Sequence, residues 1–367
     1  MKRLTEFDQL ADPTFSSTVI AWQKQHGRHA LPWQNTSDAY RIWLSEIMLQ
    51  QTQVAAVLGY YARFLERFPT LLALAEAPQS DVMALWSGLG YYTRARNLHA
   101  CAQRVVLEYG AVFPSDPALL AELPGIGRST AAAISAFSSG TRAAILDGNV
   151  KRVFARVFGI DQYPGIKLVE EALWRRAEAL LPDSGIERYT QGLMDLGATL
   201  CTRARPDCAR CPLRARCVAF ASGRTDELPV RKPKKTKPEK RAAMLLIVDC
   251  GQVLLEQRAG SGIWGALLSL PEVDGHADID APAPSAPDTL AAAGRFGVVE
   301  EVRALAPLVH VFTHYKLHIY PHKIALTQRG KVEPGYVWWN LAEIEKAPLP
   351  APVKKLLAQL EQPSLFT

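Results

Sequence analysis

The stretch LAELPGIGRSTAAAISAF, residues 120–137, predicts two helices joined by a tight turn. Pro124 disfavours helical geometry in the residue before it, while Gly125 and Gly127 permit positive φ angles and close approach of the backbone. The alanine-rich segment that follows begins a second helix, whose free N–H groups can hold a phosphate. A lone G-x-G would indicate only a turn between helices. The whole string L-P-G-I-G-x-x-T-A is typical of a helix–hairpin–helix element, at about residues 118–138, that holds the DNA backbone without reading base sequence.

The composition favours a basic protein of more than one domain. The chain has 367 residues, 48% of them apolar, with a net charge of +6 and a pI of about 9.0. This length predicts two or three domains, and the charge favours an anionic partner without proving one. No run of about 18 apolar residues predicts a membrane helix, and the start MKRLTEFDQLADP lacks the apolar core of a signal peptide. We therefore expect a cytoplasmic protein with no membrane partner.

The composition and the apolar periodicity of the sequence change once along the chain. Residues 15 to about 222 carry helical apolar spacing. Residues 228–241, LPVRKPKKTKPEKR, hold three prolines and few apolar side chains, which predicts an extended linker; it is either a plain tether or one that also touches phosphate. Residues 241–259 and 311–326 then predict strands, and residues 272–292, rich in Pro, Ala and Asp, predict a loop. The organisation is a helical domain, a basic linker and a smaller domain of strands and helices.

Four cysteines lie close together in residues 201–217, with the spacing C-x6-C-x2-C-x5-C. In a reducing compartment such a group holds metal more often than it forms disulfides. A zinc site commonly uses two C-x-x-C pairs, whereas only one is present here, and four thiolates also suit an iron–sulfur cluster. The spacing alone leaves both metals open. The four candidate ligands are Cys201, Cys208, Cys211 and Cys217.

The same segment is rich in arginine. A [4Fe–4S]²⁺ cluster with four thiolates carries a net negative charge, so arginines nearby would offset it and lower the pKa values of the thiols. The side chains that the loop presents outward could then bind an anion; the alternative is that they only balance the cluster. These arginines are Arg203, Arg205, Arg210, Arg214 and Arg216.

Two carboxyl groups are candidates for chemistry. Glu46, in SEIMLQQTQV, is predicted to lie on a helix in a polar stripe with Gln50 and Gln53, although a solvated glutamate fits the residues alone as well. Asp147, in AILDGNVKRVFARVF, precedes a helix and can be its N-cap. Breaking an N-glycosidic bond needs one protonated carboxyl for the leaving base and one carboxylate for the sugar cation. An apolar pocket would raise the pKa of the first, and hydrogen bonds would hold the pKa of the second down.

The helix–hairpin–helix string followed by this cysteine spacing resembles the endonuclease III superfamily of DNA glycosylases, and the remaining motifs narrow the resemblance to the MutY family. It covers nearly the whole chain. It implies an all-α helix–hairpin–helix glycosylase domain at residues 1–227 with an Fe–S cluster loop, the linker at 228–241, and a C-terminal α+β Nudix-like domain at 242–367. The stretch DTLAAAGRFG lacks the glutamates of the Nudix hydrolase motif, so this domain is expected to recognise 8-oxoguanine rather than to catalyse.

The resemblance also implies a reaction and a cofactor. The expected activity is hydrolysis of adenine from double-stranded DNA at A:8-oxoguanine or A:G mispairs, by a monomer acting on the nucleoid of a bacterial cell, with a [4Fe–4S] cluster on the four cysteines. Glu46 would protonate adenine N7, Asp147 would stabilise or transiently bond C1′, and Asn149 would position sugar and water. Endonuclease III-type enzymes carry a Schiff-base lysine where this chain has Ser129, which implies a monofunctional enzyme.

The remaining expected contacts concern the flipped base and its partner. The stretches QQT and GLGYYTRARN match family segments that fill the gap and hold the orphan base; Trp33 and Gln191 match positions near the flipped adenine; and Phe312-Thr313-His314 stands where many members have Phe-Ser-His. The residues alone also allow core aromatics at the tyrosines and an exposed histidine on a strand. The expected DNA contacts are Trp33, Gln51, Thr52, Leu89, Tyr91, Gly125, Gly127, Ser129, Asn149, Gln191, Thr313 and His314.

Three other functions stay open at this point. An endonuclease III-like glycosylase and lyase would share the hairpin and the cysteines, but Ser129 argues against it. A non-catalytic lesion-binding protein would need neither Glu46 nor Asp147. An electron carrier would use the cysteines but would leave the hairpin and the C-terminal domain unexplained.

Overall fold

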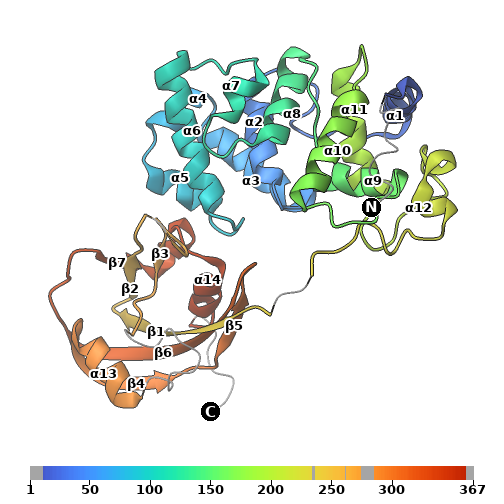
Figure 1. Ribbon diagram of the computed structural model, residues 1–367. Helices are drawn as coiled ribbons and strands as arrows, with labels where there is room; N and C mark the ends of the chain where they lie inside the picture. Colours follow the sequence, from blue (N-terminus) through green and yellow to red (C-terminus); the bar gives the residue numbers. More distant parts are fainter. Residues whose placement is uncertain (1–10, 234–235, 261, 274–284, 361–367) are drawn as a thin grey trace. The chain divides into compact units, whose positions relative to one another are not determined.

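The computed structural model describes residues 11–233, 236–260, 262–273 and 285–360 (Figure 1). Parts of both predicted domains, of the linker and of the predicted loop therefore lie outside the described residues. The chain divides into two compact units, residues 1–75 with 100–234 and residues 76–99 with 235–367. Residues 76–99 thus group with the C-terminal residues, although the sequence assigned them to the N-terminal domain.

The first unit is helical, as its apolar periodicity predicted. Asp12 caps the first helix by accepting hydrogen bonds from the N–H groups of Thr14 and Phe15. The buried ring of Phe15 packs edge-on against Phe154, with centroids 5.9 Å apart. The helices are α1 (Pro13–His26), α2 (Ala39–Leu49), α3 (Val54–Arg67), α4 (Leu71–Glu76), α7 (Pro117–Ala121), α8 (Arg128–Ser139), α9 (Gly148–Val157), α10 (Lys167–Ala179), α11 (Ile186–Asp195), the π-helix η1 (Leu196–Leu200), the short η2 (Arg214–Arg216) and α12 (Val218–Ala221), while α6 (Thr93–Tyr109) runs from the second unit into the first.

The predicted helix–hairpin–helix is present as α7, a turn and α8. Gly125 adopts a φ of 78°, which L side chains rarely adopt. Gly127 is the N-cap residue of α8, and Gly140, with a φ of 68°, ends that helix. The alanines of α8 are buried, so this helix can pack closely and fix the position of the turn.

One helix ends earlier than the sequence predicted. Leu44, Ile47 and Met48 form the expected buried face of α2. The helix stops at Leu49, and Gln51 takes a φ of 57°, so the polar stripe from Glu46 to Gln53 does not exist on one helix. The prediction of that stripe is wrong because the chain turns after α2, which leaves Gln51 exposed.

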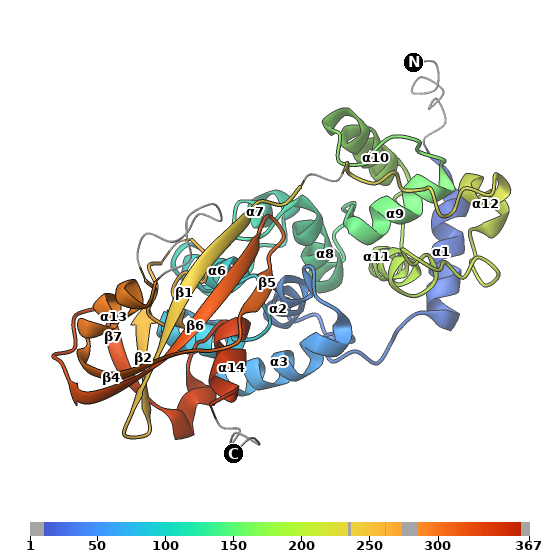
Figure 2. The same ribbon diagram turned by 90° about the horizontal axis from the view of Figure 1, so that it is seen from below.

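The second unit is built on a seven-stranded sheet with the order β3-β2-β1-β6-β4, to which β5 adds beside β6 and β7 beside β2. Figures 1 and 2 both show β1 and β6 side by side; they pair in parallel, with Ala243 opposite Tyr320. The strands are β1 (Glu239–Asp249), β2 (Gln252–Gln257), β3 (Leu268–Ser269), β4 (Gly297–Ala304), β5 (Leu308–Val311), β6 (Lys316–Arg329) and β7 (Tyr336–Asn340), and the helices are α5 (Gln79–Trp86), α13 (Ala286–Gly294), η3 (Leu341–Lys346) and α14 (Ala351–Ala358).

Two details of this unit differ from the predictions. Strand β1 begins at Glu239, so the last residues of the predicted linker already belong to the sheet. Part of the predicted loop is the helix α13, because Ser285 and Asp288 form a capping box that begins a helix despite the composition. Within the unit, the Ser87 hydroxyl donates a hydrogen bond to the Leu349 carbonyl at 2.6 Å, which joins residues 76–99 to the C-terminal residues. None of the helices in the described part of the chain is long and apolar enough to cross a membrane.

Candidate active site

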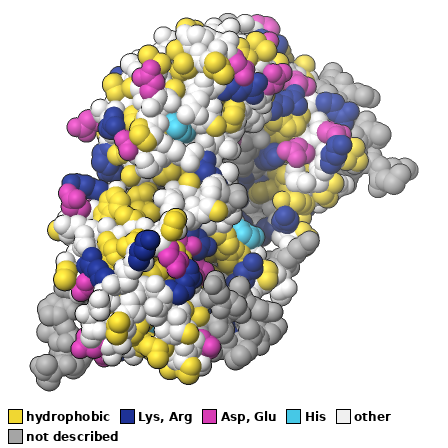
Figure 3. Space-filling model, turned by 90° about the vertical axis from the view of Figure 1, so that its left-hand side faces the viewer, with side chains coloured by type: hydrophobic (Ala, Val, Ile, Leu, Met, Phe, Trp, Pro, Cys, Tyr) yellow, Lys and Arg dark blue, Asp and Glu magenta, His cyan; other side chains and the backbone are white. Residues whose placement is uncertain are grey.

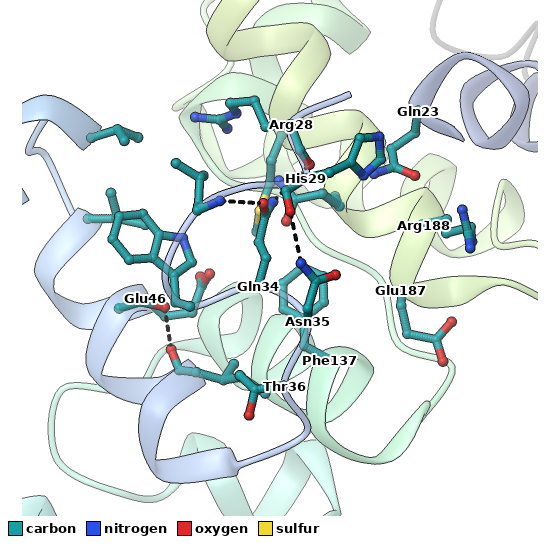
Figure 4. A pocket seen from close by; sticks show the side chains of 18 of the residues that line it. Gln23, Arg28, His29, Gln34, Asn35, Thr36, Glu46, Phe137, Glu187 and Arg188 are labelled. Atoms are coloured by element: carbon teal, nitrogen blue, oxygen red, sulfur yellow. Dashed lines mark hydrogen bonds between the residues drawn. The ribbon is translucent and has the colours of Figure 1, made fainter. Parts of the chain in front are cut away.

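A cavity of about 450 Å³ opens in the first unit, within the size range of small-molecule sites. Glu46 enters it from α2, and Figure 4 shows Glu187 and Arg188, on α11, on the opposite side. The segment between α1 and α2 supplies much of the remaining wall. The other lining residues are Gln23, Arg28, His29, Leu31, Trp33, Gln34, Asn35, Thr36, Ser37, Ile42, Ser45, Leu49, Val54, Phe137, Gln191 and Met194.

Side-chain hydrogen bonds fix the wall between α1 and α2. The Gln34 amide accepts from the Leu31 N–H and donates to the Arg28 carbonyl, both at 3.1 Å. Asn35 donates to the His29 carbonyl at 2.8 Å (Figure 4). Trp33 is only 8% exposed, and its ring packs edge-on against the buried ring of Tyr61. This part of the cavity is therefore preformed rather than mobile loop.

Glu46 has the electrostatic character of a general acid. Burial and, to a smaller extent, the negative charge of Asp147 together raise its pKa to about 8. A carboxyl with that pKa carries its proton at neutral pH, when an ordinary glutamic acid has lost it. The upward direction of this pKa shift is the one expected from the sequence, and burial is its main cause.

Asp147 is the N-cap of α9, as the sequence predicted. Its carboxylate accepts from the Val150 N–H at 2.8 Å and from the Asn149 amide at 3.2 Å. These bonds and the charge of Arg152 lower the pKa of Asp147, but burial outweighs them and the net shift is upward. The prediction that hydrogen bonds hold this pKa down is therefore wrong. Neither Asp147 nor Asn149 lines the cavity; Asp147 acts on Glu46 through its charge.

Ser129 joins the hairpin to the segment that carries Asp147. Its hydroxyl oxygen accepts a hydrogen bond from the Leu146 N–H at 3.0 Å, one residue before Asp147. The neighbouring Arg128 ion-pairs with Glu178. The start of α8 is thus held from two sides.

The four cysteines border one pocket in the first unit, and none of them forms a disulfide. Within the described residues, no three His, Cys, Asp or Glu side chains lie close enough together to hold a single metal ion. Burial raises the pKa of Cys211 to about 11 and also raises the pKa of Cys208 and of Cys217. The charge of Arg156 lowers the pKa of Cys208 and of Cys217, the direction predicted for a nearby arginine, but burial outweighs it and the net shift is upward.

The arginines of the cysteine loop do not all point outward. Arg216 ion-pairs with Asp12 at 2.5 Å and donates to the Thr14 hydroxyl at 2.8 Å, so it anchors the loop to α1. The prediction that it faces an anion is wrong for that reason. The other four remain exposed: Arg203, Arg205, Arg210 and Arg214.

Two arginines of α9 connect the candidate active site to the cysteine loop, and the sequence analysis missed both. Arg152 donates to the Asn149 side chain, to the Gly197 carbonyl and to the Cys201 carbonyl, each at 2.7 Å. Arg156, only 2% exposed, donates to the Cys201 sulfur at 3.3 Å. Their i, i+4 spacing on a helix that begins at the candidate Asp147 was the available signal.

We expect Arg156→Met to destabilise the first unit by about 3 kcal/mol, because it orphans several buried acceptors at once. The guanidinium also donates to the carbonyls of Leu228 at 2.8 Å, Thr202 at 2.7 Å and Arg203 at 3.2 Å. Urea unfolding of the full chain measures the effect. The exposed Arg175→Met on α10 is the matched control and should change little; equal midpoints for the two variants would contradict the prediction.

The second unit has a pocket of its own, of about 500 Å³, which gathers several predicted contacts. Tyr91, 43% exposed, lines it together with Thr313 and His314 from the turn between β5 and β6. The ring of Trp264 lies 5.8 Å from that of Phe312 on the same wall. The resemblance placed an orphan base beside these residues.

Three further predicted residues lie elsewhere or differ in exposure. Leu89 is 9% exposed and does not line this pocket. Gln51 is exposed and Thr52 is half-buried after α2. In Figure 3, basic side chains of the described residues lie among acidic and apolar ones.

The fold and these sites define a class of protein. Residues 44–179 match the family model described as HhH-GPD superfamily base excision DNA repair protein, and residues 242–359 match a NUDIX domain. The solved structure of a thermostable thymine-DNA glycosylase is 30% identical, with a TM-score of 0.52, over 57% of this chain and 96% of that chain. The chain is a helix–hairpin–helix DNA N-glycosylase with a C-terminal α+β Nudix-like domain, which confirms the predicted fold class.

Relatives that match nearly the whole of this chain narrow the class to a family. The adenine DNA glycosylase of Buchnera aphidicola subsp. Acyrthosiphon pisum is 34% identical over 95% of this chain and 98% of its own length. The human adenine DNA glycosylase is 33% identical over 95% of this chain and 74% of its own length. The chain belongs to the adenine DNA glycosylase family.

Proposed function

We propose that this enzyme hydrolyses the N-glycosidic bond of adenine mispaired with 8-oxoguanine or guanine in double-stranded DNA, and that it leaves the strand uncut. The observation that carries the proposal is Glu46, a carboxyl with a pKa of about 8 in the wall of a cavity that also holds Trp33 and Gln191. A flipped adenine in this cavity would meet an acid that still has its proton at neutral pH.

The proposed reaction divides between two carboxyl groups. Glu46 gives its proton to adenine N7, which makes the base a better leaving group as the bond from N9 to C1′ breaks. Asp147, ionised, stabilises the positive charge that develops on the sugar, and Asn149 holds its carboxylate from the side. Water then adds to C1′ and releases a proton, which returns Glu46 to its protonated form, and an abasic site is left. Ser129 offers no amine, so no Schiff base and no strand cleavage follow.

We propose a [4Fe–4S] cluster on Cys201, Cys208, Cys211 and Cys217. Four free thiols around one pocket of the first unit support it. The raised pKa values of Cys208, Cys211 and Cys217 mean that a bound cationic centre has to supply the charge that keeps these three thiols ionised. When bound, the cluster supplies iron ligation that folds the loop and positions its exposed arginines for DNA phosphate.

We also propose a division of labour along the chain. Residues 1–75 and 100–227 carry the chemistry, residues 228–238 form a basic linker, and residues 76–99 together with 239–367 recognise the base opposite adenine. The pocket of Tyr91, Thr313 and His314 supports the last assignment, and α13 lacks the glutamates that a Nudix hydrolase needs. The enzyme would act as a monomer on nucleoid DNA in the cytoplasm.

The test is single-turnover cleavage of a duplex with adenine opposite 8-oxoguanine, sampled with and without later alkali. Strand breaks that appear only after alkali are expected from a monofunctional glycosylase. Breaks without alkali would indicate a lyase, and tight binding without breaks a lesion-binding protein. Either result would overturn the proposal.

We expect Thr313→Ala and His314→Ala to lower the preference for 8-oxoguanine over guanine opposite adenine by about tenfold each, the value of one lost hydrogen bond to a buried base. Both side chains line the pocket of the second unit. Thr327→Ala, an exposed threonine of β6 outside that pocket, is the control. An unchanged preference in both pocket variants would contradict the assigned recognition role.

A further inference from the structure

One buried carboxylate in the first unit has no role in the chemistry so far. Asp195, the last residue of α11, has a fully buried side chain. It accepts three hydrogen bonds, from the Arg28 backbone N–H at 2.8 Å, from Arg28 Nε at 2.6 Å and from Gln191 Nε2 at 2.9 Å. Its partners Arg28 and Gln191 both line the cavity that contains Glu46.

The chemistry of this carboxylate fixes the polarity of the Gln191 amide. An ionised carboxylate paired with arginine only accepts hydrogen bonds, so the side of Gln191 that faces Asp195 has to be the NH₂ group. The opposite orientation would set the Gln191 carbonyl against the carboxylate. Since Gln191 and Asp195 stand one turn apart on α11, the amide is held by its own helix. Its carbonyl oxygen is then left for the base, as a fixed acceptor.

A fixed acceptor distinguishes between purines. The exocyclic group at position 6 is an NH₂ donor in adenine and a carbonyl acceptor in hypoxanthine and guanine. A free glutamine could rotate its amide to suit either group. A glutamine held in one orientation would accept a hydrogen bond from the amino group of a 6-aminopurine, but its carbonyl oxygen would face the carbonyl oxygen of a 6-oxopurine. Sites built for one hydrogen bond reject analogues that lack it.

We propose that Asp195 is a positioning residue that holds the Gln191 carbonyl toward the flipped base and thereby makes the cavity selective for 6-aminopurines over 6-oxopurines. This inference rests on the proposed function of the cavity. Because Asp195 also accepts hydrogen bonds from the backbone N–H and the Nε–H of Arg28, the same carboxylate holds the part of the cavity wall that follows α1.

The test compares excision of adenine and of hypoxanthine opposite the same partner base under single-turnover conditions. In Asp195→Asn, the new amide can donate to Gln191, which then turns its own carbonyl toward residue 195 and its NH₂ toward the base. The rate ratio of adenine to hypoxanthine should fall by at least about tenfold. Asp183→Asn, an exposed aspartate between α10 and α11, should keep the wild-type ratio.

A second variant separates the effect of the fixed Gln191 amide from the intrinsic reactivity of the two bases. Gln191→Met removes the acceptor, so the ratio should fall there as well, and adding Asp195→Asn to it should change the ratio no further. An Asp195→Asn enzyme that is folded, active on adenine and unchanged in its ratio would overturn the inference. A wild-type enzyme that does not excise adenine at all would instead overturn the proposed function.

A measurement on the unmodified protein covers the case in which Asp195→Asn does not fold. With selective labelling of glutamine and arginine, the Gln191 NH₂ protons should show a nuclear Overhauser contact to the Arg28 Nε proton, because both donate to the same oxygen of Asp195. Absence of that contact, with both signals assigned, would mean that the Gln191 amide points the other way. It would refute the proposal that Asp195 fixes the orientation of this amide.

Discussion

Glu46→Gln should lower the single-turnover rate of adenine excision by about 10³-fold, in the middle of the range for loss of a general acid. The amide keeps the shape of the side chain but has no proton to give. Binding of a duplex with an uncleavable adenine analogue should stay within a few-fold of wild type, because the change removes no backbone contact. The exposed Glu66→Gln on α3 serves as the matched control. A rate within tenfold of wild type would remove Glu46 from the proposed mechanism.

The pH dependence of the rate tests the same assignment independently. Glu46 must be protonated, so the rate should fall as the pH rises through about 8. Asp147 must be ionised, so the rate should also fall as the pH drops through its pKa, which burial raises above its ordinary value. The pair interacts by charge, so both limbs belong to the coupled system. In Glu46→Gln the alkaline limb should vanish; its persistence would identify another acid.

The free energy of unfolding should also depend on pH through Glu46, and it should decrease as the pH rises. The pKa of Glu46 is higher in the folded chain than its ordinary value of 4.5, so its contribution to the free energy of unfolding is present at low pH and is lost as the pH rises toward about 8. Glu46→Gln removes this dependence. Relative to wild type, the variant should therefore gain stability between mildly acidic and alkaline pH in urea unfolding curves.

Local patterns in the sequence predicted much of the fold. The glycines of the hairpin, the buried face of α2 and the N-cap at Asp147 each depend on neighbours within a few residues, and all are present. The pair of Arg216 with Asp12 joins positions 204 residues apart, and that of Arg28 with Asp195 joins positions 167 apart. No local pattern of residues predicts such long-range pairs.

The sign of the pKa shift at Asp147 could not be read from the sequence for a related reason. The hydrogen bonds that lower it come from residues two and three positions away and were predictable. The burial that outweighs them depends on how the surrounding helices pack. In the same way, α2 ends at Leu49 because the chain turns at Gln51. Gln51 has a positive φ, but no glycine stands at this position to indicate the turn in the sequence.

Gly197→Ala should lower the excision rate by about 10²-fold, although it lies outside the cavity. A Cβ at this position would lie 2.5 Å from the Cβ of Asn149 and 3.1 Å from its Cα. Both are atoms of the helix backbone or are rigidly attached to it, so α9 has to move. The Gly197 carbonyl also accepts from Arg152 at 2.7 Å, which ties the π-helix η1 to the same turn of α9.

The displacement should reach the chemistry through Asn149, whose amide donates to the Asp147 carboxylate. Gly148→Ala is the matched control: it lies between those two residues, yet a Cβ there meets nothing within 4 Å, so it should keep nearly the wild-type rate. The form of the progress curve separates a displaced site from a merely unstable fold. A displaced site lowers the single-turnover rate constant at full amplitude, whereas partial unfolding lowers the amplitude at an unchanged rate constant. Gly197→Ala with the wild-type rate constant would show that the position of Asn149 does not depend on this contact.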